Sequence, residues 1–359
     1  MTNWAVATIA TRNYLHYIRV LSASVLQIHP EAIIIVCLVD EPPQGWRPEL
    51  ERFQVIMGRD LGIPNWNQFL FQYSPFELTC ALKPFVLNHI LKTKKVAKLF
   101  YFDGDILVCG RLDDLLNKLE STNVILTPHL TEPMSVIEPD PWEVDIISTG
   151  IFNGGFVGLR NSETARAMLD WWQTRNRSWC KHEINMHDQG WLEAVPVLFD
   201  GVLIEREGRY NAAVWNTGTR SFAEDEQGGV TVNGKSLAFF HFASLDPDKP
   251  GSLSRIARRD YEQEPAAVRR LHRGYLAQLQ AAGMAQCRAW GYQFNRLTDG
   301  TPIKEEWREL VRLHHPALQA VENPFSWGRW KFERLVCEVG FTKLVGRARR
   351  YWCAIFYKS

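Results

Sequence analysis

The sequence predicts an α/β fold in which a doubly wound sheet is covered by helices. Three observations lead to this expectation. Segments with strand and helix character alternate along residues 4–102. One of the strands, residues 32–39, is a continuous apolar run rich in β-branched side chains, which is typical of a strand buried on both faces. After about residue 254 the chain changes to helical periodicity. Ligands of such folds gather at the carboxyl ends of the strands.

The first half of the chain supplies the sheet. The expected strands are residues 4–9, 32–39, 98–102, 123–127 and 152–159. Apolar side chains recur at helical spacing after Tyr14, after Leu78 and between Ser162 and Arg175, so each of these segments is expected to be a helix. Residues 131–148 show no clear periodicity and are expected to form a loop.

The second half predicts a hairpin followed by helices. Asn233-Gly234 is a strong turn signal between two apolar segments, residues 230–232 and 237–242. Residues 255–284 and 304–312 have helical character. We therefore expect two domains, a catalytic domain (1–254) and a helical extension (255–359).

Composition and charge narrow the classes of partner. Of 359 residues, 46% are hydrophobic and 23% are charged, as in an ordinary globular protein. The 41 basic residues nearly balance the 40 acidic ones, and this net charge of +1 disfavours nucleic acid as a partner. Seven scattered cysteines indicate a reducing compartment. Because neither a signal-like N-terminus nor a long apolar segment is present, we expect a cytoplasmic location.

Asp103 and Asp105 form the sharpest local signal. They follow the apolar strand 98–102 and are separated by Gly104. Side chains two residues apart on an extended chain point to the same side. Paired carboxylates suit Mg²⁺ or Mn²⁺, and such an ion can neutralise a diphosphate and stabilise its departure. The alternative is that Asp-Gly-Asp is only a surface turn.

Three further segments place polar groups in apolar surroundings. Asn153 precedes Gly154 inside an apolar strand, where glycines indicate a close ligand contact or, alternatively, a β-bulge in the core. Asp188 and Gln189 begin an apparent helix, where Asp188 by itself is explained as an N-cap. His241 lies in an apolar strand, where a histidine is more often a core residue than a ligand.

In this order, the four segments resemble the motifs of retaining GT-A glycosyltransferases, a group that includes glycogenin and bacterial lipooligosaccharide galactosyltransferases. The resemblance covers about residues 4–250. It implies a Rossmann-like GT-A domain that binds a nucleotide sugar, here followed by a mainly helical C-terminal extension. It also implies metal-dependent transfer from a nucleotide-diphosphate sugar, with a UDP-sugar favoured and the anomeric configuration retained. The expected acceptor is a glycan or a lipid-linked molecule of surface polysaccharide or glycoconjugate synthesis.

The resemblance assigns roles to individual positions. It places Mn²⁺ (or Mg²⁺) on Asp103, Asp105 and His241, and the catalytic positions on Asp188, Gln189 and Asn153. The expected donor-binding residues are Ala7, Thr8, Thr11, Asn13, Tyr14, Lys83, Asp103, Gly104, Asp105, Asn153, Gly154, Asp188, Gln189, Ser244 and Lys249. Outside the family context, Tyr14 is equally explained as a core residue of the following helix, and Lys83 as a solvated helix lysine.

The segment after His241 departs from the pattern of the group. The group has a glycine three residues after the histidine, and this chain has Ser244 there. The lysine that follows is displaced by two residues, to Lys249.

A closer resemblance is to poorly described bacterial glycosyltransferases linked to surface polysaccharide synthesis. The segments that carry it include residues 210–216, 299–303 and 323–325. The resemblance therefore extends to about residue 325. It names no sugar.

Two rival functions remain open at this stage. A sugar nucleotidyltransferase would carry a glycine-rich basic loop after the first strand, and residues 7–14 contain no glycine. A non-catalytic nucleotide-sugar-binding subunit is the second. The C-terminal segments 327–334 and 343–352 mix basic and aromatic residues, which suits a peripheral helix on the inner face of the cytoplasmic membrane. The alternative is an amphipathic helix packed on the catalytic domain with a solvated basic face.

Overall fold

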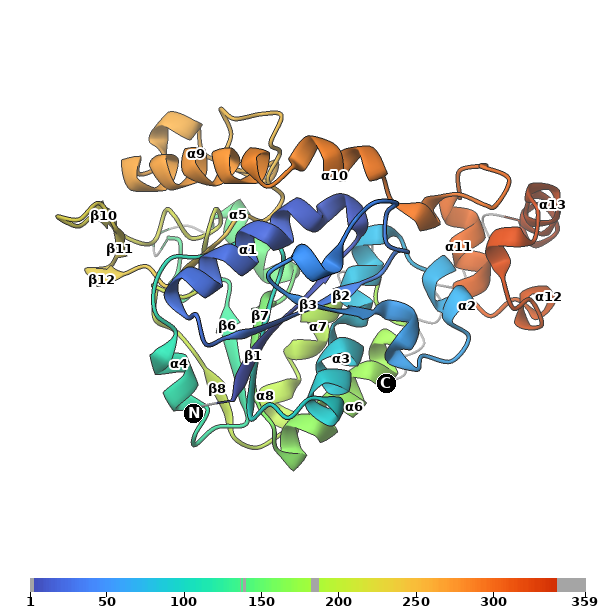
Figure 1. Cartoon of the computed structure of the whole chain (residues 1–359), viewed down its shortest axis with the longest axis horizontal. Helices are drawn as coiled ribbons and strands as arrows, with labels where there is room; N and C mark the ends of the chain where they lie inside the picture. Colours follow the sequence, from blue (N-terminus) through green and yellow to red (C-terminus); the bar gives the residue numbers. More distant parts are fainter. Residues whose placement is uncertain (1–2, 136, 138–139, 182–186, 341–359) are drawn as a thin grey trace. The chain divides into compact units, whose positions relative to one another are not determined.

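The chain folds around a mixed sheet of seven strands in the order β3-β2-β1-β4-β7-β6-β8 (Figure 1). The computed structural model describes residues 3–135, 137, 140–181 and 187–340. Strands β3, β2, β1 and β4 are parallel, whereas β7 runs antiparallel to both of its neighbours. The strands are β1 (Trp4–Ala10), β2 (Ile33–Leu38), β3 (Gln54–Met57), β4 (Lys98–Phe102), β6 (Val124–Pro128), β7 (Phe152–Arg160) and β8 (Val202–Ile204). The predicted α/β fold class is confirmed.

The main core lies against this sheet. Every residue of β1 is buried, so side chains on both sides of its pleat are covered. On one face, helices α1 (Leu15–Ile28) and α4 (Asp113–Lys118) pack apolar side chains against the strands, including Val6 of β1 and Phe100 of β4. The helix expected after Tyr14 is therefore confirmed.

Two further helices lie side by side. These are α3 (Pro75–Thr93) and α6 (Glu163–Asn176), and Asn88 Nδ2 donates a hydrogen bond to Asp170 Oδ1 at 2.6 Å. Figure 1 shows both on the side of β1 and β2 away from α1. Helices on both faces of the sheet explain why β2, which lies between β3 and β1, is apolar throughout.

Two small sheets complete this part of the chain. One has the order β5-β13-β9 and the other β10-β11-β12. Their strands are β5 (Ile106–Val108), β9 (Ala212–Ala213), β10 (Phe222–Glu224), β11 (Val230–Val232), β12 (Lys235–Ser236) and β13 (Phe239–His241). The expected hairpin is confirmed between β11 and β12, and Asn233 and Gly234 both have positive φ, as its tight turn requires. Residues 239–241 leave the hairpin and pair with β5 instead.

Two expectations about helices are wrong. Residues 141–148 are not a loop but helix α5 (Pro141–Ser148), which begins with Pro141 at its first position and with the Asp140 side chain accepting a hydrogen bond from the Trp142 amide at 2.8 Å. The helix expected over residues 255–284 begins only at α9 (Ala266–Ala281); Pro265 stands at its N-cap and disfavours helical geometry at Glu264, so the helix does not extend further back.

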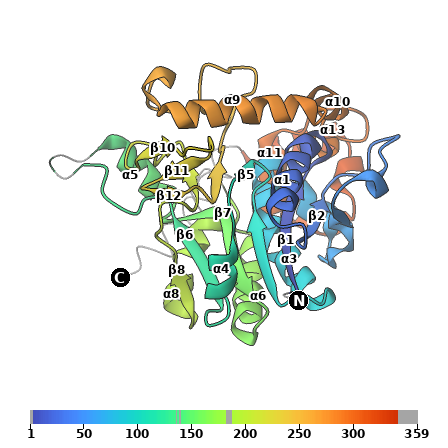
Figure 2. The same cartoon turned by 60° about the vertical axis from the view of Figure 1, so that its left-hand side comes forward.

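Besides α9, this part of the chain contains some short helices. They are α7 (Asp188–Leu192), α8 (Val195–Leu198) and α10 (Met284–Trp290). Helices α9 and α10 both pack against α1, and α9 lies above it in both views (Figures 1 and 2). Tyr275 of α9 stacks on Phe242 with ring centroids 4.0 Å apart and planes inclined by 8°.

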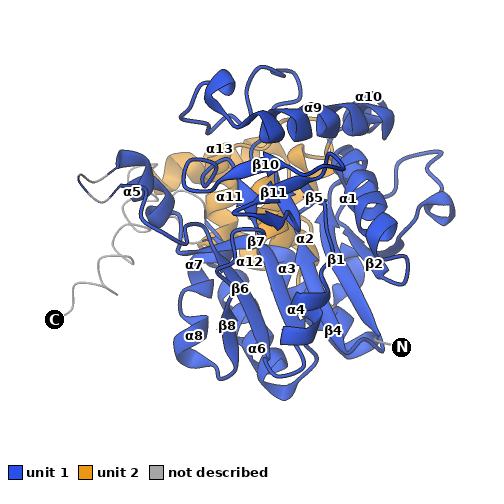
Figure 3. Cartoon of the chain, turned by 90° about the vertical axis from the view of Figure 1, so that its left-hand side faces the viewer, with its two compact units in different colours: residues 1–61, 81–291 blue, residues 62–80, 292–359 orange. Residues whose placement is uncertain are grey.

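The chain divides into two compact units (Figure 3). Unit 1 comprises residues 1–61 and 81–291, and unit 2 comprises residues 62–80 and 292–359. The division after residue 291 differs from the expected boundary near residue 254, because α9 contributes Tyr275 and its neighbours to a buried cluster of unit 1.

Unit 2 has its own aromatic core. It contains α2 (Trp66–Phe71), α11 (Glu305–Arg312), α12 (Pro316–Gln319) and α13 (Arg329–Val339), and α11 confirms the helix expected at residues 304–312. Phe332 stacks on Phe71 and on Trp307, each with centroids 5.2 Å apart. The buried Arg308 donates to the Phe71 and Tyr73 carbonyls at 2.9 and 2.6 Å, and so satisfies the end of α2.

The C-terminal basic and aromatic segments are only partly described. Residues 343–352 lie outside the described residues. In residues 327–334, Trp327 packs edge-on against Phe332 at 4.9 Å, whereas Trp330 is exposed. Among the described helices, none combines the length and apolar character that crossing a bilayer requires.

Candidate metal and donor site

The backbone after β4 fixes the position of Asp103 and Asp105. The Asp103 amide donates to the Gly155 carbonyl at 2.8 Å and so continues the pairing of β4 with β7. The Phe242 amide donates to the Asp105 carbonyl at 2.9 Å, next to the pairing of β5 with β13. The two aspartates are therefore held between β7 and β13, at the carboxyl end of a strand of the main sheet.

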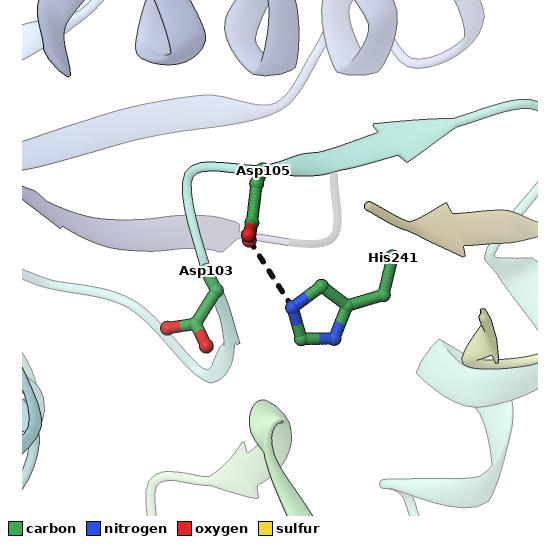
Figure 4. A group of neighbouring side chains, drawn as sticks. All are labelled: Asp103, Asp105 and His241. Atoms are coloured by element: carbon green, nitrogen blue, oxygen red, sulfur yellow. Dashed lines mark ion pairs between the residues drawn. The ribbon is translucent and has the colours of Figure 1, made fainter. Parts of the chain in front are cut away.

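Asp103, Asp105 and His241 form one cluster (Figure 4). Each offers a ligand atom, and these atoms lie within 4.8 Å of one another. His241 enters the cluster because β13 pairs with β5 in a register that sets it beside Ile106, the residue after Asp105. His241 Nε2 lies 3.1 Å from Asp105 Oδ1. The structure thus brings together the three residues that the sequence predicts as metal ligands.

The cluster matches the donor set of a small divalent cation. Two carboxylates and one imidazole combine oxygen and nitrogen donors, which suits Mn²⁺ and also Mg²⁺. Tyr101 donates its hydroxyl hydrogen to Asp103 Oδ1 at 2.7 Å, an outer contact of the kind that orients metal-binding carboxylates. The Asp103 and Asp105 side chains are each 28% exposed, so the cluster is open to a ligand from solvent.

Asp105 and His241 shift each other's proton affinity. Burial disfavours the charged form of both groups, but their mutual attraction outweighs it. The pKa of Asp105 is therefore lowered and the pKa of His241 is raised. In the metal-free protein, the His241 proton occupies the place in which a cation would neutralise Asp105.

Lys83 is buried in the site and is not a solvated helix lysine. It is 3% exposed, and its Nζ lies 3.1 Å from Asp103 Oδ1 and 2.6 Å from Asp188 Oδ2. It also donates to the Gly154 carbonyl at 2.9 Å. A single ammonium group therefore ties β4, β7 and the start of α7 together and compensates two carboxylates.

Asp188 is an ion-pair partner rather than a helix cap. It is the first residue of α7, and its side chain caps no amide there; the residue before it, His187, holds the N-cap position. Burial would raise the pKa of Asp188, but Lys83 and His187 outweigh this effect and hold it well below its usual range. Asp188 is therefore ionised at neutral pH.

Gln189 and Asn153 use their amides within the protein. Gln189 accepts a hydrogen bond from the Gly154 amide at 3.3 Å and donates to the Thr149 carbonyl at 2.7 Å. Asn153 is 6% exposed, and its Oδ1 accepts from the Gly155 amide at 3.1 Å. Both residues lie at the site as expected, but their side-chain amides form hydrogen bonds with backbone groups around the site.

Two glycines allow this close packing. A Cβ at Gly154 would lie 2.4 Å from Asp188 Oδ2, and a Cβ at Gly155 would lie 2.4 Å from His241 Cε1. The glycines are explained by the approach of side chains to β7 rather than by an unusual backbone. Gly104 is also crowded, because its Cβ would lie 2.8 Å from the Ile18 side chain.

The expected nucleoside-binding segment lies after β1. Ala7 is buried within the strand and Thr11 follows it, also buried. Two buried polar atoms, Thr8 Oγ1 and Asn13 Oδ1, have no hydrogen-bond partner among the residues that the structure describes. Tyr14 is 50% exposed and is therefore not a core residue. Unpaired buried polar atoms beside an exposed aromatic ring are suited to a ligand that offers both hydrogen bonds and a flat face.

Ser244 adopts a backbone conformation that favours glycine, the residue that the family pattern leads one to expect there. Its φ is 56°, in the left-handed region that favours glycine, and its carbonyl accepts from the Arg255 amide at 3.0 Å. Lys249 lies exposed in the following turn, where its amide donates to the Asp246 carbonyl at 2.9 Å. No contact of its side chain with the site is observed in the described part of the chain.

The sequence did not single out three residues of the site. Tyr101 was read only as part of a strand, and Trp215 only as part of the segment 210–216. His129, one residue after β6, was not selected at all. A polar residue directly after an apolar strand was the available signal for His129, and the same signal identified Asp103.

Sequence comparisons give distant relatives. No family model matches the chain. The uncharacterized protein YfnF of Bacillus subtilis (strain 168) is 22% identical over 251 residues, which cover 67% of this chain and 80% of YfnF. YfnD of the same organism, also uncharacterized, is 26% identical over 175 residues, covering 47% of this chain and 54% of YfnD. The chain therefore spans about half the length of YfnD.

Several solved structures similar to the chain are glycosyltransferases. The galactosyltransferase LgtC, in complex with donor and acceptor sugar analogues, aligns with 15% identity and a TM-score of 0.47 over 85% of this chain and 99% of LgtC. The glycosyltransferase GlyE of Streptococcus pneumoniae TIGR4 aligns with 17% identity and a TM-score of 0.44 over 80% of this chain and 64% of GlyE. Mouse xyloside xylosyltransferase 1 aligns with 11% identity and a TM-score of 0.39 over 66% of this chain and 97% of that enzyme. The chain is similar to all three at a distance.

Proposed function

We propose that the protein is a metal-dependent glycosyltransferase that moves a sugar from a nucleotide diphosphate, with a UDP-sugar favoured, to a glycan or lipid-linked acceptor with retention. The observation that carries the proposal is one continuous site. In it, Lys83 links the acidic cluster of Asp103, Asp105 and His241 to the ionised Asp188. A cation and a diphosphate could therefore bind at the cluster, with the carboxylate of Asp188 close by.

Asp103, Asp105 and His241 would hold Mn²⁺ or Mg²⁺. Such an ion supplies charge neutralisation to a diphosphate leaving group. The chain prepares this place by fixing Asp103 through Tyr101 and Lys83, and by setting His241 against Asp105. The carboxylates are held in position by the fold before a donor binds, so little reorganisation is required on binding.

The donor would bind with its nucleoside at the end of β1. Thr8 and Asn13 offer hydrogen-bonding atoms that lack a protein partner among the described residues, and Tyr14 offers an exposed ring for the base. The position of Lys83 in the interior favours a role in compensating the carboxylates around the diphosphate. The exposed Lys249 is left with no structural support for contacting it.

Asp188 would face the donor sugar and stabilise positive charge that develops at its anomeric carbon. The close pair with Lys83, at 2.6 Å, supports this electrostatic role over covalent attack, because a compensated carboxylate of low pKa is a weak nucleophile. Gln189 and Asn153 would act by keeping β7 and α7 together around the sugar. We extend the proposal to the acceptor class only through the resemblance of the motifs.

Differential scanning fluorimetry with nucleotide diphosphates and nucleotide sugars, each with Mn²⁺ or with EDTA, tests the proposal. A ligand that binds the folded state raises the melting temperature. We expect a rise that requires Mn²⁺ and is largest for uridine nucleotides. Acceptor screening with the matching donor then follows by product analysis.

Each other outcome has a defined meaning. A shift with nucleotide sugars but no product with any acceptor would favour the non-catalytic nucleotide-sugar-binding subunit. The absence of any nucleotide- or Mn²⁺-dependent shift in folded protein would contradict both the donor site and the metal site.

A further inference from the structure

We propose that His129 and Asn153 are positioning residues that keep a hydrogen on Nδ1 of His241, so that a cation which displaces the Nε2 proton finds the lone pair there, facing Asp103 and Asp105. The proposal rests on the metal site of the proposed function. It adds two residues that contact neither the carboxylates nor the expected ion position, and it gives a task to the segment 210–216.

The contacts form a chain of hydrogen bonds with a defined direction. His129 Nδ1 lies 2.8 Å from the Gly150 carbonyl, and a carbonyl can only accept. The hydrogen of His129 is therefore on Nδ1. Its Nε2 then accepts from Asn153 Nδ2, at 3.1 Å. Burial lowers the pKa of His129 to about 4, so the imidazole is neutral at physiological pH.

The other end of the chain requires the same direction. The Gly155 amide donates to Asn153 Oδ1 at 3.1 Å, and an amide N–H can only donate. Asn153 therefore presents its oxygen toward His241, whose Nδ1 lies 3.2 Å from that oxygen. Because this oxygen can only accept, His241 carries a hydrogen on Nδ1. Two independent backbone groups, one at each end, thus determine the orientation of the whole chain.

The result for His241 is a defined role for each ring nitrogen. In neutral imidazole, a hydrogen on Nδ1 leaves Nε2 with the lone pair. This Nε2 is the atom that lies 3.1 Å from Asp105 Oδ1, on the side of the carboxylates. The other tautomer would present an N–H to the cation and a lone pair to Asn153 Oδ1, so it could neither coordinate the ion nor keep the hydrogen bond to Asn153.

Trp215 restrains both histidines. Its ring meets His129 at a centroid distance of 5.1 Å and His241 at 5.4 Å, edge to face in both cases. Asn216 donates to the His129 carbonyl at 3.3 Å, and β9, just before it, pairs with β13 so that Ala213 lies beside His241. The segment 210–216 thus packs against the chain of hydrogen bonds. This explains why the segment contains polar and aromatic residues although it contributes no predicted ligand.

The experiment compares His129→Phe, which removes both ring nitrogens, with His129→Gln, whose amide can replace the bond to Asn153. His272→Asn, at a buried histidine of α9 whose Nδ1 lies 3.0 Å from the Tyr261 hydroxyl, is the matched control. Mn²⁺ affinity is measured by the electron paramagnetic resonance signal of free Mn²⁺. We expect affinity to fall about 10- to 100-fold in His129→Phe, the range for loss of an outer-shell partner, and to be largely restored in His129→Gln.

A second readout follows the tautomer itself. Nitrogen NMR of histidine-labelled, metal-free protein shows whether Nδ1 of His241 carries a hydrogen, separately from the Nε2 that pairs with Asp105. We expect a hydrogen on Nδ1 in the wild type and a mixture of protonated and unprotonated Nδ1 in His129→Phe, a change that mere loss of stability does not produce. Wild-type Mn²⁺ affinity together with an unchanged tautomer in folded His129→Phe overturns the inference and leaves the proposed function intact. A wild-type protein that binds no Mn²⁺ contradicts the proposed metal site instead, and the tautomer measurement then decides the chain of hydrogen bonds by itself.

Discussion

Asp105 has two partners in the site, His241 and the predicted cation, and its charge serves both. Replacing Asp105 by asparagine keeps the shape and removes the charge. We expect donor turnover to fall by about 10²–10³, by analogy with the loss of one stabilising group at a reacting oxyanion. Mn²⁺ affinity should fall as well, and the raised pKa of His241 should return toward its ordinary value.

Donor hydrolysis and isothermal titration with Mn²⁺ measure these effects. Asp113→Asn is the control, because Asp113 pairs only with the exposed Arg111 on the surface. Wild-type turnover with an unchanged Mn²⁺ requirement in Asp105→Asn would overturn the assignment of Asp105 as a ligand.

Gly155 offers a test that changes no charge or hydrogen-bonding group. An alanine Cβ there would lie 2.4 Å from His241 Cε1 and 2.7 Å from Asn153 Oδ1, so His241 must shift. We expect Gly155→Ala to lower the free energy of unfolding by about 1–3 kcal/mol, as overpacking does, and to weaken Mn²⁺ binding more than 10-fold. Urea unfolding and Mn²⁺ titration measure the two effects.

Gly251→Ala is the matched control for Gly155→Ala. Nothing lies within 4 Å of a Cβ at Gly251, and its backbone is not in the left-handed region. Equal effects of the two substitutions would show that the crowding at Gly155 is relieved at no cost, contrary to the rigid site described above.

The site residues divide by the kind of signal that they carry in the sequence. Asp103, Asp105 and His241 could be predicted because polar groups in or directly after apolar strands stand out and match a family motif. His129 carries the same local signal, but its role and that of Trp215 could not be predicted, because these roles depend on β6, β9 and β13 meeting in space. Neither their spacing nor their neighbours in the sequence contain that information.

At the scale of elements, α9 carries a decisive packing contact. Tyr275 is fully buried and stacks on Phe242, but its hydroxyl has no partner among the described residues. Tyr275→Ala removes the stack and leaves a cavity, so the free energy of unfolding should fall by about 3–5 kcal/mol. Tyr275→Phe removes only the unpaired hydroxyl and should be neutral or slightly stabilising.

Urea unfolding of both variants measures the difference. A loss below about 1 kcal/mol in Tyr275→Ala, within the ordinary range for surface positions, would contradict the assignment of α9 to the core of unit 1. A large loss in Tyr275→Phe would show that the hydroxyl has a partner after all.

Long elements that carry a sequence pattern of their own could be predicted, whereas short elements that form only by pairing with another strand could not. The long apolar strands β1, β2, β4 and β7 carry a local pattern, and they form at the expected places. Strands β5 and β9 contain three and two residues, too few for any periodicity, and exist because they pair with β13. Helix α5 was missed because its start is marked by the Asp140 cap and Pro141, whereas the expectation relied on apolar spacing.

Across the whole molecule, buried neutral histidines couple stability to pH. Burial lowers the pKa of His272 from 6.5 to about 4. Between these values the unfolded chain binds a proton that the folded protein does not, so stability falls as pH falls from 6.5 toward 4. One pKa unit equals about 1.4 kcal/mol, so His272 alone accounts for a loss on the order of 3 kcal/mol.

The free energy of unfolding by urea, measured between pH 7 and pH 4 (roughly the window in which a histidine titrates), tests this. We expect His272→Asn to have a shallower pH dependence than the wild type, even though it is less stable at pH 7. Parallel curves for the two proteins would show that His272 is protonated equally in the folded and unfolded states.

Unit 2 is built from two separate segments of the chain, and this affects how it forms during synthesis on the ribosome. Residues 62–80 are synthesised about 210 residues before residue 292, where the rest of the unit begins. At about 5–20 residues per second, Phe71 waits roughly 12–50 s for Trp307 and Phe332. Throughout that interval unit 2 cannot complete its core, while the strands of unit 1 are already arriving. Translation speed between residues 81 and 291 therefore sets how long Phe71 remains without its partners in the aromatic core.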